Sequence, residues 1–163
     1  MLQHLLREGS IVLGLTASSR EEALKQLIEK IPGEALVDQD RKFLFELLLQ
    51  RENFGTTAIG DGVAMPHCAF SGVSFPVGVL GISPEGIDWQ SIDGARVHVI
   101  FLCIFPDVDG LSELKRRVLA PAESILKDVL FQSRLGGAES GQEVYDMILR
   151  ESSDRLPALR VAQ

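Results

Sequence analysis

One histidine of this chain lies in a segment suited to nucleophilic chemistry on an anion. His67 follows Pro66, which lacks a backbone N–H and biases Met65 towards an extended conformation. The imidazole is therefore expected at the end of a rigid, extended piece. Imidazole can accept a phosphoryl group reversibly, because its unperturbed pKa of about 6.5 leaves much of it neutral and nucleophilic at cell pH.

The residues before this histidine could bind the anion. The segment 55–62 is rich in glycine, which allows close backbone approach, and Gly60 is one of these positions. The hydroxyls of Thr56 and Thr57 and the backbone N–H groups could donate to phosphate oxygens. Asp61 could orient the ring, or it could be a solvated turn aspartate. On residue types alone, a surface histidine in a glycine-rich loop remains an alternative.

The two cysteines, Cys68 and Cys103, lie far apart without a C-x-x-C spacing, which is typical of a reduced, cytoplasmic setting. Cys68 is next to His67 and raises the alternative of a Cys–His hydrolase. Adjacent residues of an extended segment point to opposite faces, which disfavours a shared nucleophile or metal site. We therefore expect no metal and no cofactor.

Composition excludes several classes of protein. The formal net charge of −7 disfavours nucleic-acid binding, which needs a basic surface. The longest apolar run, 97–105, is far shorter than the roughly 20 residues that span a bilayer. No secretory leader is recognisable at the start of the chain. We expect a cytoplasmic protein without direct membrane insertion, and one whose partners are other proteins.

Hydrophobic periodicity predicts helices alternating with strands, and hence an α/β fold with helices on both faces of a sheet. One strand, 97–105, is apolar except for His98 and should be buried on both faces. The sequence favours a single domain over 1–163, with a core of about 10–150 and a frayed tail over 152–163. The helices are predicted over 20–31, 40–52, 111–135 with a kink at Pro121, and 141–150, and the other strand over 76–82.

Two stretches resemble a known family. Arg51-Glu52, Thr56 to Gly60 and Val63 to His67 are similar to the phosphorylation-site signature of phosphotransferase-system (PTS) EIIA domains of the fructose, mannitol and nitrogen-regulatory type. The stretch 86–101 resembles the family segment that leads into a central strand. The likeness spans roughly residues 10–150.

This resemblance implies one α/β domain with a mixed sheet between helices. It also implies a phosphohistidine phosphotransferase component, in which His67 accepts a phosphoryl group from a phosphocarrier protein of the HPr type. The matching arginine is Arg51, whose fixed guanidinium charge would stabilise the phosphate. The partners implied are the HPr-type donor and either an EIIB domain or regulatory target proteins.

The chain departs from the family at one position. Many members carry a second histidine near the start of the helix after the central strand, here within 111–118, and none is present. Lys115, Arg116 and Arg117 are candidate substitutes. The departure favours regulation through protein partners over delivery to a sugar-transport partner. A binding module that keeps the fold without phosphorylation is the alternative.

Overall fold

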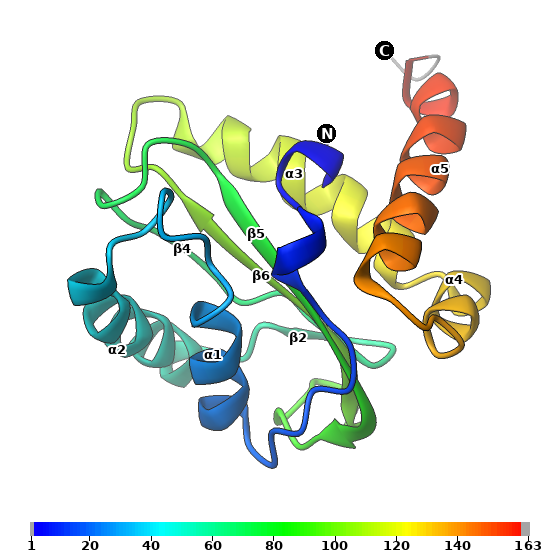
Figure 1. The fold of residues 1–163 in the computed structure, drawn as a ribbon, viewed down its shortest axis with the longest axis horizontal. Helices are drawn as coiled ribbons and strands as arrows, with labels where there is room; N and C mark the ends of the chain where they lie inside the picture. Colours follow the sequence, from blue (N-terminus) through cyan, green and yellow to red (C-terminus); the bar gives the residue numbers. More distant parts are fainter. Residues whose placement is uncertain (1, 161–163) are drawn as a thin grey trace.

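The computed structural model describes residues 2–160 of the chain. A mixed sheet lies between two layers of helices (Figure 1), as the sequence predicts. The strand order is β1-β5-β6-β3-β2, and β4 pairs with β6 beyond the end of β3. The strands are β1 (Ile11–Val12), β2 (Ala58–Gly60), β3 (Val63–Ala64), β4 (His67–Ala69), β5 (Val77–Ile87) and β6 (Val97–Phe105).

The strand β6 is the centre of the sheet because both of its faces are apolar. Ile100, Leu102 and Ile104 pack on one side, in a cluster that includes side chains of α1 and α2. Phe101 and Phe105 pack on the other side, against α3, α4 and α5. The antiparallel β5 covers one edge of β6, while β3 and β4 run parallel along the other edge. The prediction of a strand buried on both faces is confirmed.

Helices α1 and α2 lie together on one face of the sheet (Figure 1). The helix α1 (Arg20–Ile28) begins at Ser19, whose side chain accepts the backbone N–H of Glu22. It ends three residues before the predicted end. The Arg41 guanidinium of α2 (Asp38–Phe54) donates to the carbonyl oxygens of Ile28 and Ile31 there. These bonds satisfy carbonyls that the ending helix leaves unpaired.

The buried stripe of α2 is narrower than the sequence predicts. Leu44 and Leu48 are fully buried, whereas Phe43 is 58% exposed and Leu47 is half-buried. The buried stripe continues at the same four-residue spacing to a carboxylate, Glu52. A polar side chain therefore replaces an apolar one at the end of the helix that precedes the glycine-rich segment.

The helix predicted over 111–135 is two helices, α3 (Leu111–Leu126) and α4 (Val129–Leu135). Pro121 lies inside α3 and does not end it. The break comes at Asp128, whose side chain caps α4 by accepting the N–H of Phe131. The prediction of one continuous helix over 111–135 was therefore wrong, because a side-chain cap at Asp128 starts a second helix.

The last helix, α5 (Gly141–Arg160), continues ten residues beyond its predicted end. Arg155 holds this extension by donating to the carbonyl oxygen of Ser124 and to the carboxylate of Asp128. The remainder of the tail predicted to fray, residues 161–163, lies outside the described residues. Among the helices of residues 2–160, none combines the length and apolar character that crossing a bilayer requires.

Candidate functional site

His67 begins β4, the second of two short strands that lie along the same edge of β6. The first, β3, pairs Ala64 with Ile100, and β4 pairs His67 with Cys103. Between them the carbonyl oxygen of Pro66 accepts the N–H of Cys103 at 3.0 Å. The histidine is therefore held by the central strand rather than by a free loop, as the Pro-His sequence indicated.

A hydrogen bond sets the tautomer of the His67 ring. Its Nδ1 lies 2.8 Å from the carbonyl oxygen of Met65. A carbonyl can only accept, so Nδ1 carries the hydrogen and Nε2 keeps its lone pair. The ring also meets Phe105 edge to face, with centroids 6.5 Å apart. The half-buried imidazole thus presents Nε2 as the nucleophilic atom.

The pKa of His67 is lowered from its ordinary value, chiefly because burial disfavours the charged ring. The hydrogen bond to Met65 opposes this shift. The positive charges of Lys115 and, more weakly, of Arg51 lower the pKa further, and the carboxylate of Glu52 raises it. The structure therefore brings two cations into electrostatic range of the ring, one from α3 and one from the last turn of α2.

The lowered pKa predicts how reaction at His67 depends on pH. The neutral ring is the nucleophile, so its reactivity should persist as the pH falls through 6.5, the ordinary histidine value, and be lost only below it. Phosphorylation rate against pH, together with an NMR titration of the ring nitrogens, measures this. A midpoint at or above 6.5 would contradict the lowered pKa.

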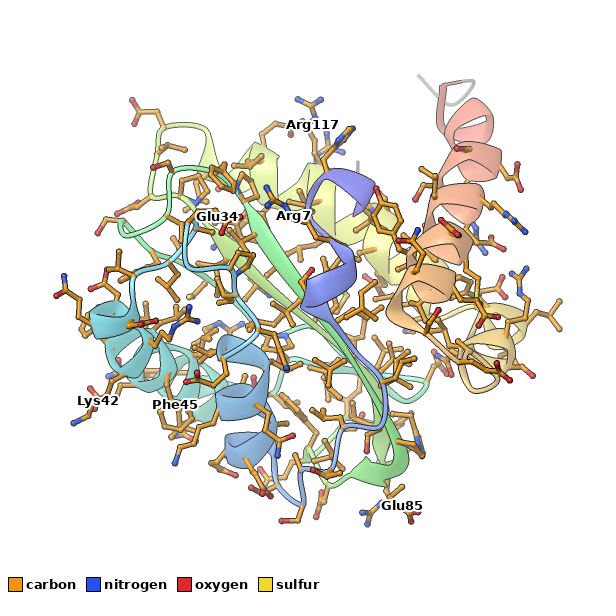
Figure 2. All side chains as sticks on the ribbon, viewed as in Figure 1. Arg7, Glu34, Lys42, Phe45, Glu85 and Arg117 are labelled. Carbon is orange, nitrogen blue, oxygen red and sulfur yellow. The ribbon has the colours of Figure 1, made fainter. Side chains whose placement is uncertain are left out.

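Of the three basic residues at the start of α3, only Lys115 contributes to the lowered pKa of His67. It is half-buried, whereas Arg116 and Arg117 are exposed. Arg116 instead forms an ion pair with Glu113, one turn earlier, at 2.8 Å. Figure 2 shows Arg117 at the outer surface near α3. The structure thus separates one candidate substitute for the missing histidine from two solvated charges.

Thr56 and Thr57, which were expected to donate to phosphate oxygens, form hydrogen bonds within the protein. The N–H and hydroxyl of Thr57 both donate to the Glu52 carboxylate, at 2.7 and 2.6 Å. The hydroxyl of Thr56 donates to the carbonyl oxygen of Trp89 at 3.3 Å. These donors support the segment before His67, and their expected role in phosphate binding stays a prediction. No role at the site was predicted for Glu52, although its spacing from Leu44 and Leu48 places it on the buried face of α2.

Gly60 and Asp61 lie away from His67 along the central strand. The carbonyl oxygen of Gly62 accepts the N–H groups of His98 and Val99, at the start of β6. His67 pairs with Cys103, which lies four residues beyond Val99 in β6. Four residues correspond to about 13 Å along a strand. The Asp61 carboxylate instead forms an ion pair with Lys127 at 3.2 Å. The chain reverses at 60–62, with positive φ at all three residues, which carries these neighbours in sequence away from the histidine.

Cys68 does not form a pair with His67. Its side chain belongs to the apolar cluster on the α1–α2 side, while the His67 ring contacts Phe105 of the opposite cluster. Burial raises the pKa of the Cys68 thiol to about 12, so it is not a thiolate nucleophile. Within residues 2–160, no group of three or more His, Cys, Asp or Glu side chains could hold a metal ion.

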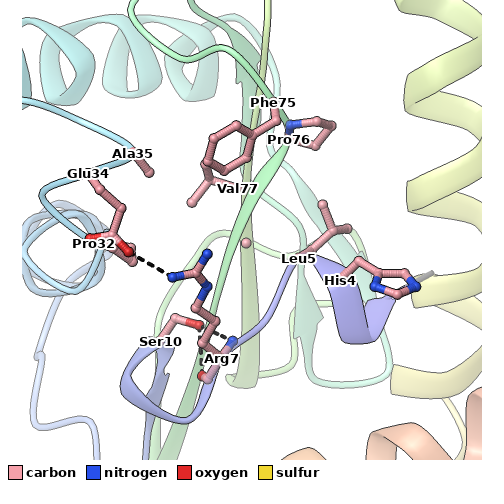
Figure 3. A pocket seen from close by; sticks show the side chains of 11 residues that line it. His4, Leu5, Arg7, Ser10, Pro32, Glu34, Ala35, Phe75, Pro76 and Val77 are labelled. Atoms are coloured by element: carbon pink, nitrogen blue, oxygen red, sulfur yellow. Dashed lines mark hydrogen bonds and ion pairs between the residues drawn. The ribbon is translucent and has the colours of Figure 1, made fainter.

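A small cavity lies between the N-terminal segment and the start of β5 (Figure 3). Arg7 reaches across it to Glu34, with 2.7 Å between Nη1 and Oε1. The cavity of about 20 Å³ admits roughly one water molecule. It is too small for a sugar, and His67 is not among its lining residues.

Known proteins resemble this chain in both sequence and fold. The family model for the phosphoenolpyruvate-dependent sugar phosphotransferase system, EIIA 2, matches residues 4–151. A nitrogen regulatory protein of Bradyrhizobium diazoefficiens is 33% identical over 144 residues, covering 88% of this chain and 92% of the relative. A PTS fructose-specific EIIA component of Haloferax volcanii is 30% identical over 131 residues, covering 80% of this chain and 83% of the relative.

Solved structures agree with the fold. The crystal structure of the nitrogen regulatory protein IIA-Ntr from Neisseria meningitidis superposes with a TM-score of 0.80 at 24% identity, covering 90% of this chain and 98% of that one. IIA mannitol from Escherichia coli gives a TM-score of 0.70 at 21% identity, covering 88% and 98%. At these identities the likeness is one of fold.

Proposed function

The chain belongs to the EIIA 2 family of the phosphoenolpyruvate-dependent sugar phosphotransferase system, and from this we propose that it is a phosphocarrier that accepts a phosphoryl group on Nε2 of His67. The donor is a protein of the HPr type. The observation that carries the proposal is the hydrogen bond of Nδ1 to the Met65 carbonyl, which leaves Nε2 with its lone pair on a ring within electrostatic range of Lys115 and Arg51.

The chemistry follows from this geometry. The lone pair of Nε2 forms the new N–P bond while the bond from phosphorus to the donor protein breaks. The proton on Nδ1 stays in place, and the Met65 carbonyl stabilises the positive charge that develops on the ring. Phosphoryl transfer otherwise asks for alignment and for positive charge around the equatorial oxygens. Lys115 and Arg51 supply that charge.

Lys115 takes the part of the second histidine that many family members carry. An ammonium group binds phosphate as a point charge, whereas a neutral imidazole offers one hydrogen bond. A permanent cation should stabilise the phosphorylated state of His67. This favours a long-lived signal over rapid onward delivery.

The partners are proteins. EIIA domains of this family work with HPr-type donors and EIIB domains, and the mannitol IIA of Escherichia coli has been solved in complex with phosphorylated IIB. Two features favour a mainly regulatory role for this chain, namely the relatives that are named nitrogen regulatory proteins and the absence of the second histidine. Phosphorylation adds a charge of about −2 beside exposed α2 and α3 residues, enough to strengthen or weaken a protein interface.

Incubation with phosphoenolpyruvate, the general PTS phosphorylating enzyme and an HPr-type carrier tests the proposal. One acid-labile phosphate per chain is expected, and ³¹P and ¹⁵N NMR should place it on Nε2. A reaction without the carrier controls for direct labelling. An unlabelled chain, or a phosphate on Nδ1, would contradict the proposal.

A further inference from the structure

Glu52 is a buried carboxylate at the end of α2, next in sequence to Arg51. It is 2% exposed and accepts three hydrogen bonds. Thr57 donates its N–H and its hydroxyl, at 2.7 and 2.6 Å, and Trp89 donates its indole N–H at 2.9 Å. A buried carboxylate is costly unless its oxygens are satisfied. These three hydrogen bonds satisfy the buried carboxylate. Two of them hold Thr57, one through its backbone and one through its side chain.

From Thr57 the hydrogen bonds continue to the nucleophile. The carbonyl oxygen of Thr57 accepts the N–H of Met65 at 3.0 Å. The carbonyl oxygen of Met65 accepts the Nδ1–H of His67 at 2.8 Å. The carboxylate and the imidazole are thus joined through two residues, each of which is held by a hydrogen bond of its own.

We infer, given the proposed phosphoryl transfer, that Glu52 is a positioning residue for His67. Its carboxylate fixes Thr57, Thr57 fixes Met65, and the Met65 carbonyl fixes the tautomer and direction of the ring. If Thr57 is released, the Met65 carbonyl can turn, and the ring can take the other tautomer, whose Nε2 carries hydrogen and cannot attack phosphorus. Glu52 touches neither the phosphate nor the reacting atoms.

The position of the Glu52 carboxylate and its charge need separate tests. The Glu52 charge raises the pKa of His67, in opposition to Lys115 and Arg51. An effect of any Glu52 variant could therefore come from electrostatics alone. Two conservative substitutions distinguish these causes, because one keeps the shape and removes the charge, and the other keeps the charge and withdraws the carboxylate.

Glu52→Gln keeps the position. Its amide oxygen can accept from the Thr57 N–H and the Trp89 indole, which share one carboxylate oxygen in the native protein, and its NH₂ can donate to the Thr57 hydroxyl. Glu52→Asp keeps the charge but is shorter by one methylene, so the carboxylate draws back from Thr57. Glu46 on the same helix is exposed, and Glu46→Gln and Glu46→Asp are the matched controls.

The measurements are the ¹⁵N chemical shifts of the His67 ring, which report its tautomer, and the rate of phosphate incorporation. Glu52→Gln should keep the single Nδ1–H tautomer and a rate close to that of the native chain. Glu52→Asp should show both tautomers and a rate roughly 10- to 100-fold lower, the scale of loss when a reacting group is misplaced. Both Glu46 variants should match the native chain, and thermal unfolding should show all four folded.

The outcomes decide between the explanations. A native tautomer and rate in Glu52→Asp, or a slow Glu52→Gln beside a normal Glu52→Asp, overturns the positioning role. If Glu52→Asp does not fold, Thr57→Val removes one bond at the same junction. The second tautomer is expected there too, and its absence overturns the inference. A native chain that takes up no phosphate but keeps its single tautomer contradicts the proposed function and leaves the positioning of the ring intact.

Discussion

Replacement of His67 by glutamine should reduce phosphate incorporation to the background level. The amide of glutamine is similar in size to part of the ring, but its nitrogen has no lone pair available for attack on phosphorus. His67 is half-buried at the edge of the sheet, so the variant should remain folded. Incorporation of phosphate from an HPr-type carrier, with circular dichroism to confirm the fold, measures the effect.

His98→Gln is a matched control for this substitution. His98 is also a strand histidine whose Nδ1 lies within hydrogen-bond distance of a carbonyl oxygen, that of Ser83 at 2.9 Å. It is exposed and lies at the opposite end of β6 from the residue that pairs with His67. His98→Gln should incorporate phosphate as the native chain does. Label that persists in His67→Gln would place the phosphate elsewhere and sink the assignment.

The His67→Gln variant also tests the alternative of a binding module that does not use phosphate. If regulation depends on phosphorylation, a partner protein should distinguish the free chain from the phosphorylated chain, and His67→Gln should behave as the free form under all conditions. Equal affinity of the partner for the native free, native phosphorylated and His67→Gln chains would instead favour the binding module.

Replacement of Lys115 by methionine should slow phosphorylation by roughly 100- to 1,000-fold, the cost of removing one group that stabilises developing charge in a transition state. Methionine keeps most of the length of the side chain and removes its charge. The pKa of His67 should rise in this variant, because Lys115 is the stronger of the two cations that lower it. Transfer kinetics and an NMR titration of His67 provide the two measurements.

Arg117→Met separates a local effect from general attraction between proteins. Arg117 is an exposed cation two residues further along α3, and the structure gives it no part in the electrostatics of His67. The Arg117→Met variant should be phosphorylated at nearly the native rate. The phosphorylation rates of Lys115→Met and Arg117→Met should be compared at one donor concentration and at saturating donor. An equal decrease in both variants under both conditions would mean that Lys115 acts only through the overall charge of the surface.

Sequence patterns predicted the framework well where one physical signal dominated. The nearly continuous apolar run of β6 predicted a strand buried on both faces, and its predicted bounds coincide with the observed ones. The Pro-His step predicted an extended, rigid setting for His67, and β4 provides it. Helical spacing also located the buried face of α3, which includes Val118 and Ala122.

The rest depended on tertiary contacts that spacing does not encode. Gly60 and Asp61 are near His67 in sequence, but the reversal at 60–62 directs them to the other end of β6. The threonine hydroxyls were expected to face an anion, yet a buried carboxylate uses one of them and a carbonyl the other. The pattern of α3 could not distinguish Lys115 from its basic neighbours, since only the packing of α3 decides which one lies close enough to lower the pKa of His67.

The attachment of β4 to the central strand determines how a phosphate at His67 can be sensed. The backbone around the histidine can open only by breaking hydrogen bonds to β6, among the most buried strands of the protein. The free and phosphorylated chains should therefore share one backbone, with similar amide hydrogen exchange along β4 and β6. A regulatory partner would then detect electrostatic potential at an unchanged surface, and its discrimination between the two forms should weaken as ionic strength increases.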